Sequence, residues 1–186
     1  MTVPTDLDRR FRESAARSGL LDAGFDVVET PLGELLVAAT ERGLLRISFD
    51  PEPEAELEHL MRIAGPRVLR APGAVDAVRR ELDEYFDHRR QRFDLTLDLR
   101  GTTAFTQAVL DELARVPYGQ TATYAELAAR SGRPKAARAV GMVMNRNPVP
   151  IVLPCHRIVG SSGDLVGYGG GLERKEALLR LEGVTF

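Results

Sequence analysis

Cysteine is almost absent from this sequence of 186 residues. The only one is Cys155, and the chain has just three histidines, His59, His88 and His156. A single thiol permits no internal disulfide and no multi-thiolate zinc or iron-sulfur site. We therefore expect no metal and no cofactor.

Long hydrophobic runs and a strong net charge are also missing. No apolar stretch approaches the ~20 residues that a membrane helix needs, and charged residues occur throughout residues 1–21. The 27 acidic and 25 basic side chains nearly cancel, and 44% of the residues are hydrophobic. This composition is typical of a globular protein of the cytoplasm that has no membrane partner.

The charge is nevertheless uneven along the chain. Residues 1–100 carry 20 acidic and 15 basic side chains, whereas residues 101–186 carry 7 acidic and 10 basic ones. No acid lies between Glu126 and Asp164. Six basic residues lie in that interval: Arg130, Arg133, Lys135, Arg138, Arg146 and Arg157. This pattern favours contact with a polyanion, although a solvated face balanced by acids of the other half explains the charges equally well.

The pattern of residues 1–100 predicts a small α/β domain. Three β-rich segments separated by short turns indicate a meander, and they are residues 25–30, 34–40 and 43–49. Apolar residues at helical spacing predict helices at 52–63 and 74–86, whereas strict alternation predicts a strand at 93–99. Residues 1–23, which precede the first strand, are interpreted as an amphipathic helix at most.

Residues 101–186 predict a second, mainly helical domain after a linker at 100–103. Apolar residues at helical spacing predict a helix over 105–116. Thr123 and Glu126 form a capping box that begins another helix, and Gly132 ends it. Pro134 is placed as the first residue of a helix that reaches about 146. Two helices joined by a short glycine-containing turn indicate a helix-turn-helix motif.

The second helix of this motif has two distinct faces at 100° per residue. The expected core face consists of Ala137, Val140 and Met144. The opposite face consists of Lys135, Arg138, Met142 and Asn145, flanked by the small residues Ala139 and Gly141. Small residues around one long cation permit a close approach to nucleic acid.

The single cysteine lies in the most informative segment, residues 147–160. Three prolines before Cys155 restrict the backbone that carries the thiol. A lone cysteine is often inert packing, but His156 and Arg157 supply a base and a positive charge, which a thiol nucleophile needs. Because adjacent side chains point apart on extended backbone, we expect His156 to reach Cys155 through a water or a backbone bend. Glu182, at the end of a helix over 172–181, is the preferred carboxylate to orient His156. The alternative interpretation is that Glu182 is an ordinary surface residue.

Several motifs of this half resemble those of the O6-alkylguanine-DNA alkyltransferases. They are Pro154-Cys155-His156-Arg157 after residues 147–153, Ser161-Ser162-Gly163, and Tyr168-Gly169-Gly170-Gly171-Leu172-Glu173-Arg174-Lys175. The resemblance extends without an evident gap over residues 105–183, whereas residues 1–100 match only in layout. It implies an α/β ribonuclease H-like domain with a small, mostly antiparallel sheet at 1–100. It also implies a mainly α domain with a winged-helix or helix-turn-helix DNA-binding motif at 101–186.

The resemblance further implies direct-reversal DNA repair. Cys155 would accept the alkyl group of O6-alkylguanine, and of O4-alkylthymine, after the base is flipped out of double-stranded DNA. His156 with a water would deprotonate the thiol, Glu182 would orient His156, and Asn147 would hold the turn. Tyr124 would push the target phosphate and face guanine N3.

The other residues that the resemblance singles out belong to two sets. The DNA-binding set is Arg138, which would fill the place of the flipped base, together with Tyr124, Lys135, Ala136, Ala137, Gly141 and Asn145. The guanine-pocket set is Pro150, Ile158, Tyr168, Gly169, Gly170 and Met144. Contact is expected in the minor groove, with a protein that is a monomer in solution and able to bind DNA as several copies side by side.

Two departures from the family pattern have consequences. Gly169 stands where some relatives have serine, which removes a hydroxyl contact to the alkylated oxygen. We expect the glycines at 169–171 to leave a roomier pocket that admits groups larger than methyl. The zinc ligands of some relatives are missing. Because no second thiol can resolve a thioether, we expect one turnover per molecule.

Three alternatives compete with this interpretation. A non-enzymatic binder of alkylated DNA, like the alkyltransferase-like proteins, would lack the acceptor that Cys155 supplies. A winged-helix regulator with a redox-sensing cysteine would need an exposed thiol and a sequence-specific site. A cysteine hydrolase normally takes its histidine from far along the chain, unlike His156.

Overall fold

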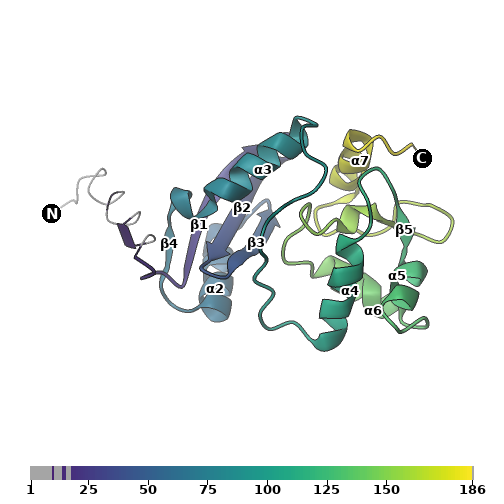
Figure 1. Cartoon of the computed structure of the whole chain (residues 1–186), viewed down its shortest axis with the longest axis horizontal. Coiled ribbons are helices and arrows are strands. Elements are labelled where there is room, and N and C mark those ends of the chain that lie inside the picture. The colour runs from purple at the N-terminus through teal and green to yellow at the C-terminus, as the bar shows by residue number, and fades with distance from the viewer. Residues whose placement is uncertain (1–9, 11–13, 16–17, 186) are drawn as a thin grey trace. The chain divides into compact units, whose positions relative to one another are not determined.

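The chain forms two compact units, Met1–Arg100 and Gly101–Phe186 (Figure 1). This computed structural model describes residue 10, residues 14–15 and residues 18–185. Most of the amphipathic helix expected within residues 1–23 lies outside the described residues. Within the described part of the chain, no helix is both long and apolar enough to cross a membrane.

A four-stranded sheet in the order β3-β2-β1-β4 is the frame of the first unit. The meander is confirmed, because β1 (Ala23–Thr30), β2 (Gly33–Thr40) and β3 (Gly43–Phe49) pair as antiparallel neighbours. The fourth strand, β4 (Val68–Arg70), runs parallel to β1 and was not predicted. Three residues are too short for an alternating pattern to be recognised.

Both helices predicted for the first unit form, with shifted ends. They are α2 (Pro53–Ala64) and α3 (Asp76–Phe86), the latter preceded by the 3-10 turn η1 (Pro72–Val75). Proline at the start of η1 fits a first turn, whose amide hydrogens have no partner inside the helix. A Cβ atom at Gly24 would lie 2.6 Å from the Cβ of Ala74, so glycine lets β1 and η1 approach closely.

The strand predicted at residues 93–99 is wrong. This segment makes only one bridge, between Leu97 and Leu44 of β3. The backbone of Leu44 donates to Thr96 and accepts from Asp98, at 2.9 and 2.8 Å, and no ladder continues from there. The Asp98 carboxylate instead accepts from the Thr40 hydroxyl and pairs with Arg100. The alternating apolar residues are only partly buried, and the polar Asp98 is the most buried residue of the segment, so the pattern does not mark a paired strand here.

The second unit is built from short helices around a two-stranded parallel sheet, β5 (Ala122–Thr123) with β6 (Ile158–Val159). The helices are α4 (Ala104–Ala114), α5 (Tyr124–Arg130), α6 (Ala137–Asn145) and α7 (Leu172–Leu181). A 3-10 turn, η2 (Cys155–Arg157), carries the cysteine. The capping box before α5 is confirmed, because Thr123 and Glu126 each accept from the other's backbone amide. Helices α5 and α6 pack together and form the helix-turn-helix arrangement.

The predicted start of the second motif helix is wrong. Pro134 and Lys135 lie in a turn that the Ala136 amide closes by donating to the Arg133 carbonyl, and α6 begins only at Ala137. Proline favours the second position of such a turn as strongly as the first turn of a helix, so the sequence signal was ambiguous. Lys135 consequently precedes the helix.

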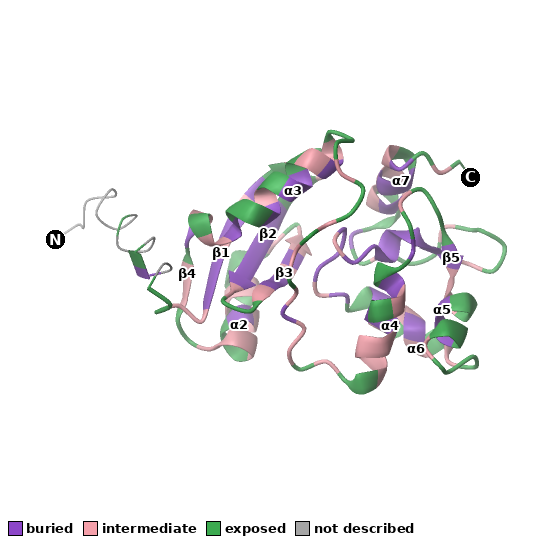
Figure 2. Cartoon of the chain, in the orientation of Figure 1, coloured by how far each residue is buried: buried purple, intermediate pink, exposed green. Residues whose placement is uncertain are grey.

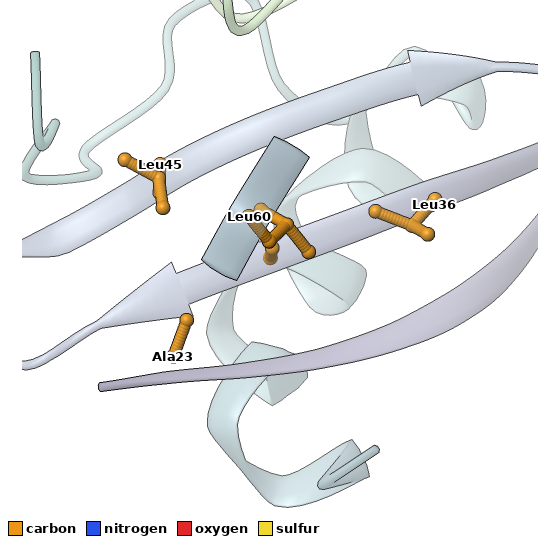
Figure 3. Close-up of a cluster of buried hydrophobic side chains, with 5 residues drawn as sticks. Ala23, Leu36, Leu45 and Leu60 are labelled. Carbon is orange, nitrogen blue, oxygen red and sulfur yellow. The ribbon is translucent and has the colours of Figure 1, made fainter. Parts of the chain in front are cut away.

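Burial follows the strands and the inward faces of the helices (Figure 2). In the first unit, Leu60 of α2 lies over the sheet and contacts a cluster that includes Ala23, Leu36 and Leu45 (Figure 3). The Leu60 side chain has no exposed surface. This contact therefore fixes α2 to one face of the sheet by apolar burial.

Replacing Leu60 with alanine should reduce the free energy of unfolding by about 2 to 5 kcal/mol, because it leaves a cavity in this cluster. The adjacent Met61 is 46% exposed, so Met61→Ala should change stability by less than about 0.5 kcal/mol. Urea unfolding of both variants measures the difference. Equal losses would contradict the packing described for α2.

Candidate functional site

The segment before Cys155 is a turn held by one amide side chain. Asn147 donates from Nδ2 to the Leu153 carbonyl at 2.7 Å, and its Oδ1 accepts from the Val149 amide at 3.1 Å. Between them, Ile151 adopts a φ of 73°, a rare and strained conformation for a β-branched residue. Because Ile151 is fully buried, packing and the Asn147 bonds together hold this conformation.

The Cys155 thiol lies at the start of η2 and is only 4% exposed. Asn147 Nδ2 is 3.1 Å from Sγ, so the same amide that clamps the turn also donates to the sulfur. Burial raises the pKa of Cys155 to about 11, although the Asn147 bond and the charge of Lys175 act in the opposite direction. The thiol is therefore protonated at neutral pH, and its use as a nucleophile requires a base.

The neighbouring His156 points to the carboxylate of Glu182, at the end of α7. Its Nε2 lies 2.9 Å from Glu182 Oε1, and both side chains are fully buried. Burial lowers the pKa of His156, with the Glu182 contacts opposing that change. The ring is therefore neutral at pH 7, and the acceptor Glu182 selects the tautomer with the proton on Nε2.

That tautomer leaves Nδ1 as a proton acceptor. His156 Nδ1 is buried and has no hydrogen-bond partner among the described residues. No direct bond joins it to the Cys155 sulfur within the described contacts. The arrangement is that of a general base with an orienting carboxylate on one nitrogen and a proton-accepting site on the other.

Arg157 completes the group in a way that the sequence analysis missed. Its guanidinium donates to both carboxylate oxygens of Glu182, with Nε–Oε2 and Nη2–Oε1 distances of 2.9 Å, and its Nη1 donates to the Val116 carbonyl at 2.6 Å. Burial alone would raise the pKa of Glu182, but the bonds from His156 and Arg157 lower it to about 2. The carboxylate is therefore charged at any pH near neutrality.

Lys175 of α7 is a second functional candidate that was missed. It is fully buried, and its Nζ donates to the carbonyls of Ile158 and Val166 at 2.5 and 2.8 Å. Burial lowers its pKa to about 8. Its position between apolar residues at helical spacing in α7 was the signal that a buried lysine was present. These bonds hold β6 and the loop after it against α7.

Tyr124, at the start of α5, contacts the same loop. Its hydroxyl donates to the Val166 carbonyl at 3.1 Å. Burial, and secondarily the nearby Cys155, raise the pKa of Tyr124, so the phenol stays protonated. The protonated hydroxyl is engaged by the Val166 carbonyl, and it can donate to negative charge on a substrate once that bond is exchanged.

The expected pocket residues come from four segments of the second unit: the turn before Cys155, β6, the loop before α7, and α6. Pro150 and Ile158 are buried, on the turn before Cys155 and on β6 respectively. Tyr168 is largely buried, and burial, then the nearby Cys155, raise its pKa well above 10. Gly169 is exposed, and a Cβ there would lie 3.6 Å from the Asn145 carbonyl oxygen. Gly170 is buried, whereas Met144 lies on the buried side of α6 together with Val140.

The expected DNA-binding residues lie on and just before α6. Arg138, Lys135 and Asn145 are exposed. Ala136, Ala137 and Gly141 are partly exposed, and Gly141 lies beside the Tyr124 ring. The structure thus separates two groups, a buried one around Cys155 and an exposed one on α6, with Tyr124 next to both. Among the described residues, no group of three or more His, Cys, Asp or Glu side chains is placed to bind a metal ion.

Both units match known family models. The model described as the 6-O-methylguanine DNA methyltransferase DNA binding domain matches residues 104–184. The model described as the ribonuclease-like domain of the same methyltransferase matches residues 25–99. The two matches extend over most of both units.

Individual relatives agree. The methylated-DNA–protein-cysteine methyltransferase of Methanosarcina barkeri is 41% identical over 85% of this chain and 96% of its own. That of Mycobacterium tuberculosis is 40% identical over 85% of this chain and 91% of its own. The crystal structure of the M. tuberculosis O6-methylguanine methyltransferase covers 86% of this chain and 92% of its own, with a TM-score of 0.75 and 39% identity. Its complex with DNA has the same coverage and TM-score at 38% identity. The chain therefore belongs to the 6-O-methylguanine DNA methyltransferase family.

Proposed function

We propose that this protein repairs alkylated DNA directly, by moving the alkyl group of O6-alkylguanine, and of O4-alkylthymine, to Cys155. The observation that carries the proposal is the buried group of Cys155, His156 and Glu182, in which the residue after the protonated thiol is an oriented, neutral imidazole with an acceptor nitrogen that is free within the described part of the chain. Its family membership supports the same activity.

The chemistry follows from the atoms of this group. The thiol proton passes through a water to His156 Nδ1, and the imidazolium that forms is stabilised by the charged Glu182. The sulfur then attacks the alkyl carbon, a C–S bond forms, and the C–O bond breaks with its electron pair left on guanine. The Tyr124 hydroxyl, facing N3, offsets the negative charge that develops on the base. The repaired guanine, still part of the strand, takes up one proton, and the imidazolium gives its extra proton back through the water.

The product sets the number of turnovers. A thioether is a poor leaving group, and the sequence has no second cysteine to displace it. Each molecule of protein therefore repairs one lesion and is consumed.

The exposed group on α6 supplies the contact with duplex DNA. Arg138 enters the stack where the target nucleotide leaves, which offsets part of the few kcal/mol that base flipping costs. The small residues Ala136, Ala137 and Gly141 allow the helix to approach a minor groove, where sequence is read only weakly. A protein that repairs lesions in any sequence context needs such weak readout. The present protein acts as a monomer, and several copies can bind side by side on DNA.

The remaining site residues position the reaction. Asn147 holds the turn that presents Cys155, and Pro150, Ile158, Tyr168, Gly170 and Met144 surround the flipped base. Gly169 leaves room for alkyl groups larger than methyl.

The alternative functions fit the site less well. A non-enzymatic binder of alkylated DNA does not need the thiol and its base. A peroxide-sensing cysteine needs a low pKa and exposure, whereas Cys155 is buried and its pKa is raised.

Incubation with an oligonucleotide that contains one O6-methylguanine should add one methylene to the Cys155 peptide, in a one-to-one and final reaction. Intact mass and peptide mapping measure the transfer, and Cys155→Ala is the control. Tight lesion binding without a mass increase would overturn the enzymatic proposal and leave a damage-recognition protein.

The pH profile should identify the base. With His156 neutral above its lowered pKa and Lys175 still charged below its pKa of about 8, the wild-type transfer rate should change little between pH 6.5 and 7.5. In His156→Gln the thiol must ionise unaided, so the rate should be lower at pH 7 and rise about tenfold per pH unit toward the Cys155 pKa of about 11. Rapid-quench transfer assays of both proteins measure this difference.

His59→Gln, on α2 of the first unit, is the matched control and should keep the wild-type profile. Parallel profiles for wild type and His156→Gln would show that His156 does not act as the base. Thermal unfolding of each variant checks that it is folded over this range.

A further inference from the structure

One apolar side chain on the exposed face of α6 is unexplained by the roles assigned above. Met142 is 56% exposed, whereas Val140 and Met144 on the other side of the helix are buried. It lies one helical turn after Arg138, and a rotation of 100° per residue places both on the same face, with Asn145. Methionine therefore occupies the middle of the surface that faces DNA in the proposed function.

The charges around Met142 indicate what this surface binds. Arg133, Lys135, Arg138 and Arg146 are all exposed near the two ends of α6. No acidic residue occurs in the sequence between Glu126 and Asp164. A single exposed methionine is ordinary on a protein surface. A methionine at the centre of a basic face is suited to binding a polyanion that also has apolar surface. Duplex DNA is such a polyanion, because its stacked bases are apolar.

The geometry points to a second wedge beside Arg138. We propose that the Met142 side chain packs into the minor groove against the exposed edge of a base step and helps hold the duplex open while the lesion is flipped. This inference rests on the proposed function. Methionine is among the apolar side chains that proteins insert between base steps, and its flexible, polarizable thioether fills irregular gaps.

The position along the helix sets the reach of such a wedge. Four residues at 1.5 Å each place Met142 about 6 Å along the axis from Arg138. This is roughly two base steps at 3.4 Å per nucleotide. The two side chains can therefore contact one duplex at points about two base steps apart, Arg138 with charge and Met142 with apolar surface.

A wedge between base steps acts only on duplex DNA, where stacked base pairs must be opened. Its loss should slow alkyl transfer from duplex DNA and leave transfer from single-stranded DNA unchanged. A residue that shaped the guanine pocket would affect both substrates alike. The ratio of the two rates therefore separates a wedge from a pocket residue.

The test uses single-turnover transfer at subsaturating concentrations, with O6-methylguanine in a duplex and in the same strand alone. Met142→Gln keeps the length of the side chain and removes its apolar character, whereas Met142→Leu keeps the apolar character. Met61→Gln, at an exposed methionine of α2, is the matched control. We expect Met142→Gln to be roughly tenfold slower on the duplex, about 1.4 kcal/mol. Its single-strand rate should stay within about twofold of wild type, and Met142→Leu should retain most of the duplex rate.

Other results overturn the inference. A duplex rate for Met142→Gln equal to that of Met61→Gln would show that Met142 makes no useful contact. An equal loss on both substrates would place Met142 in the pocket, and a loss in Met142→Leu as large as in Met142→Gln would exclude an apolar contact. If the wild-type protein transfers no methyl group from either substrate, the proposed function fails instead.

Discussion

The second unit depends on one buried carboxylate. Glu182 is 5% exposed, and it accepts hydrogen bonds from Arg157, His156 and the Gly119 amide. A buried charge without partners would cost several kcal/mol, so these bonds are what allow the carboxylate to remain there. They join the end of α7, the turn after α4 and the 3-10 turn of the cysteine. One interaction thus serves both the packing of three segments and the orientation of the imidazole.

In the turn before the cysteine, one side chain likewise serves two purposes. Ile151 is held in a left-handed conformation that costs of the order of 1 to 3 kcal/mol, and the Asn147 amide offsets this cost with bonds on both sides of the turn. The same amide also donates to Sγ, so the side chain that maintains the strained backbone also favours the thiolate. Lys175 stabilises β6 and the loop after it through bonds to the carbonyls of Ile158 and Val166.

The elements of the fold that have a strong local signal could be predicted from the sequence. The meander, the capping box at Thr123 and α7 all follow from local periodicity or short motifs. The segment at 93–99 was misjudged, because strand pairing depends on a distant partner. The Arg157–Glu182 pair was missed because it depends on segments brought together only by the fold. The partners of Lys175 depend on the fold in the same way, although its place among apolar residues of α7 indicated burial. The strain at Ile151 has no sequence signal.

The central claim is that Glu182 holds His156 as a neutral imidazole with its proton on Nε2, ready to accept a proton at Nδ1. Nitrogen-15 NMR of the histidine side chains tests this directly in the unreacted protein at pH 7. The account predicts that His156 gives a protonated Nε2 and an unprotonated Nδ1 signal, and that Glu182→Gln alters this pattern. A doubly protonated ring, or a proton on Nδ1, would contradict it.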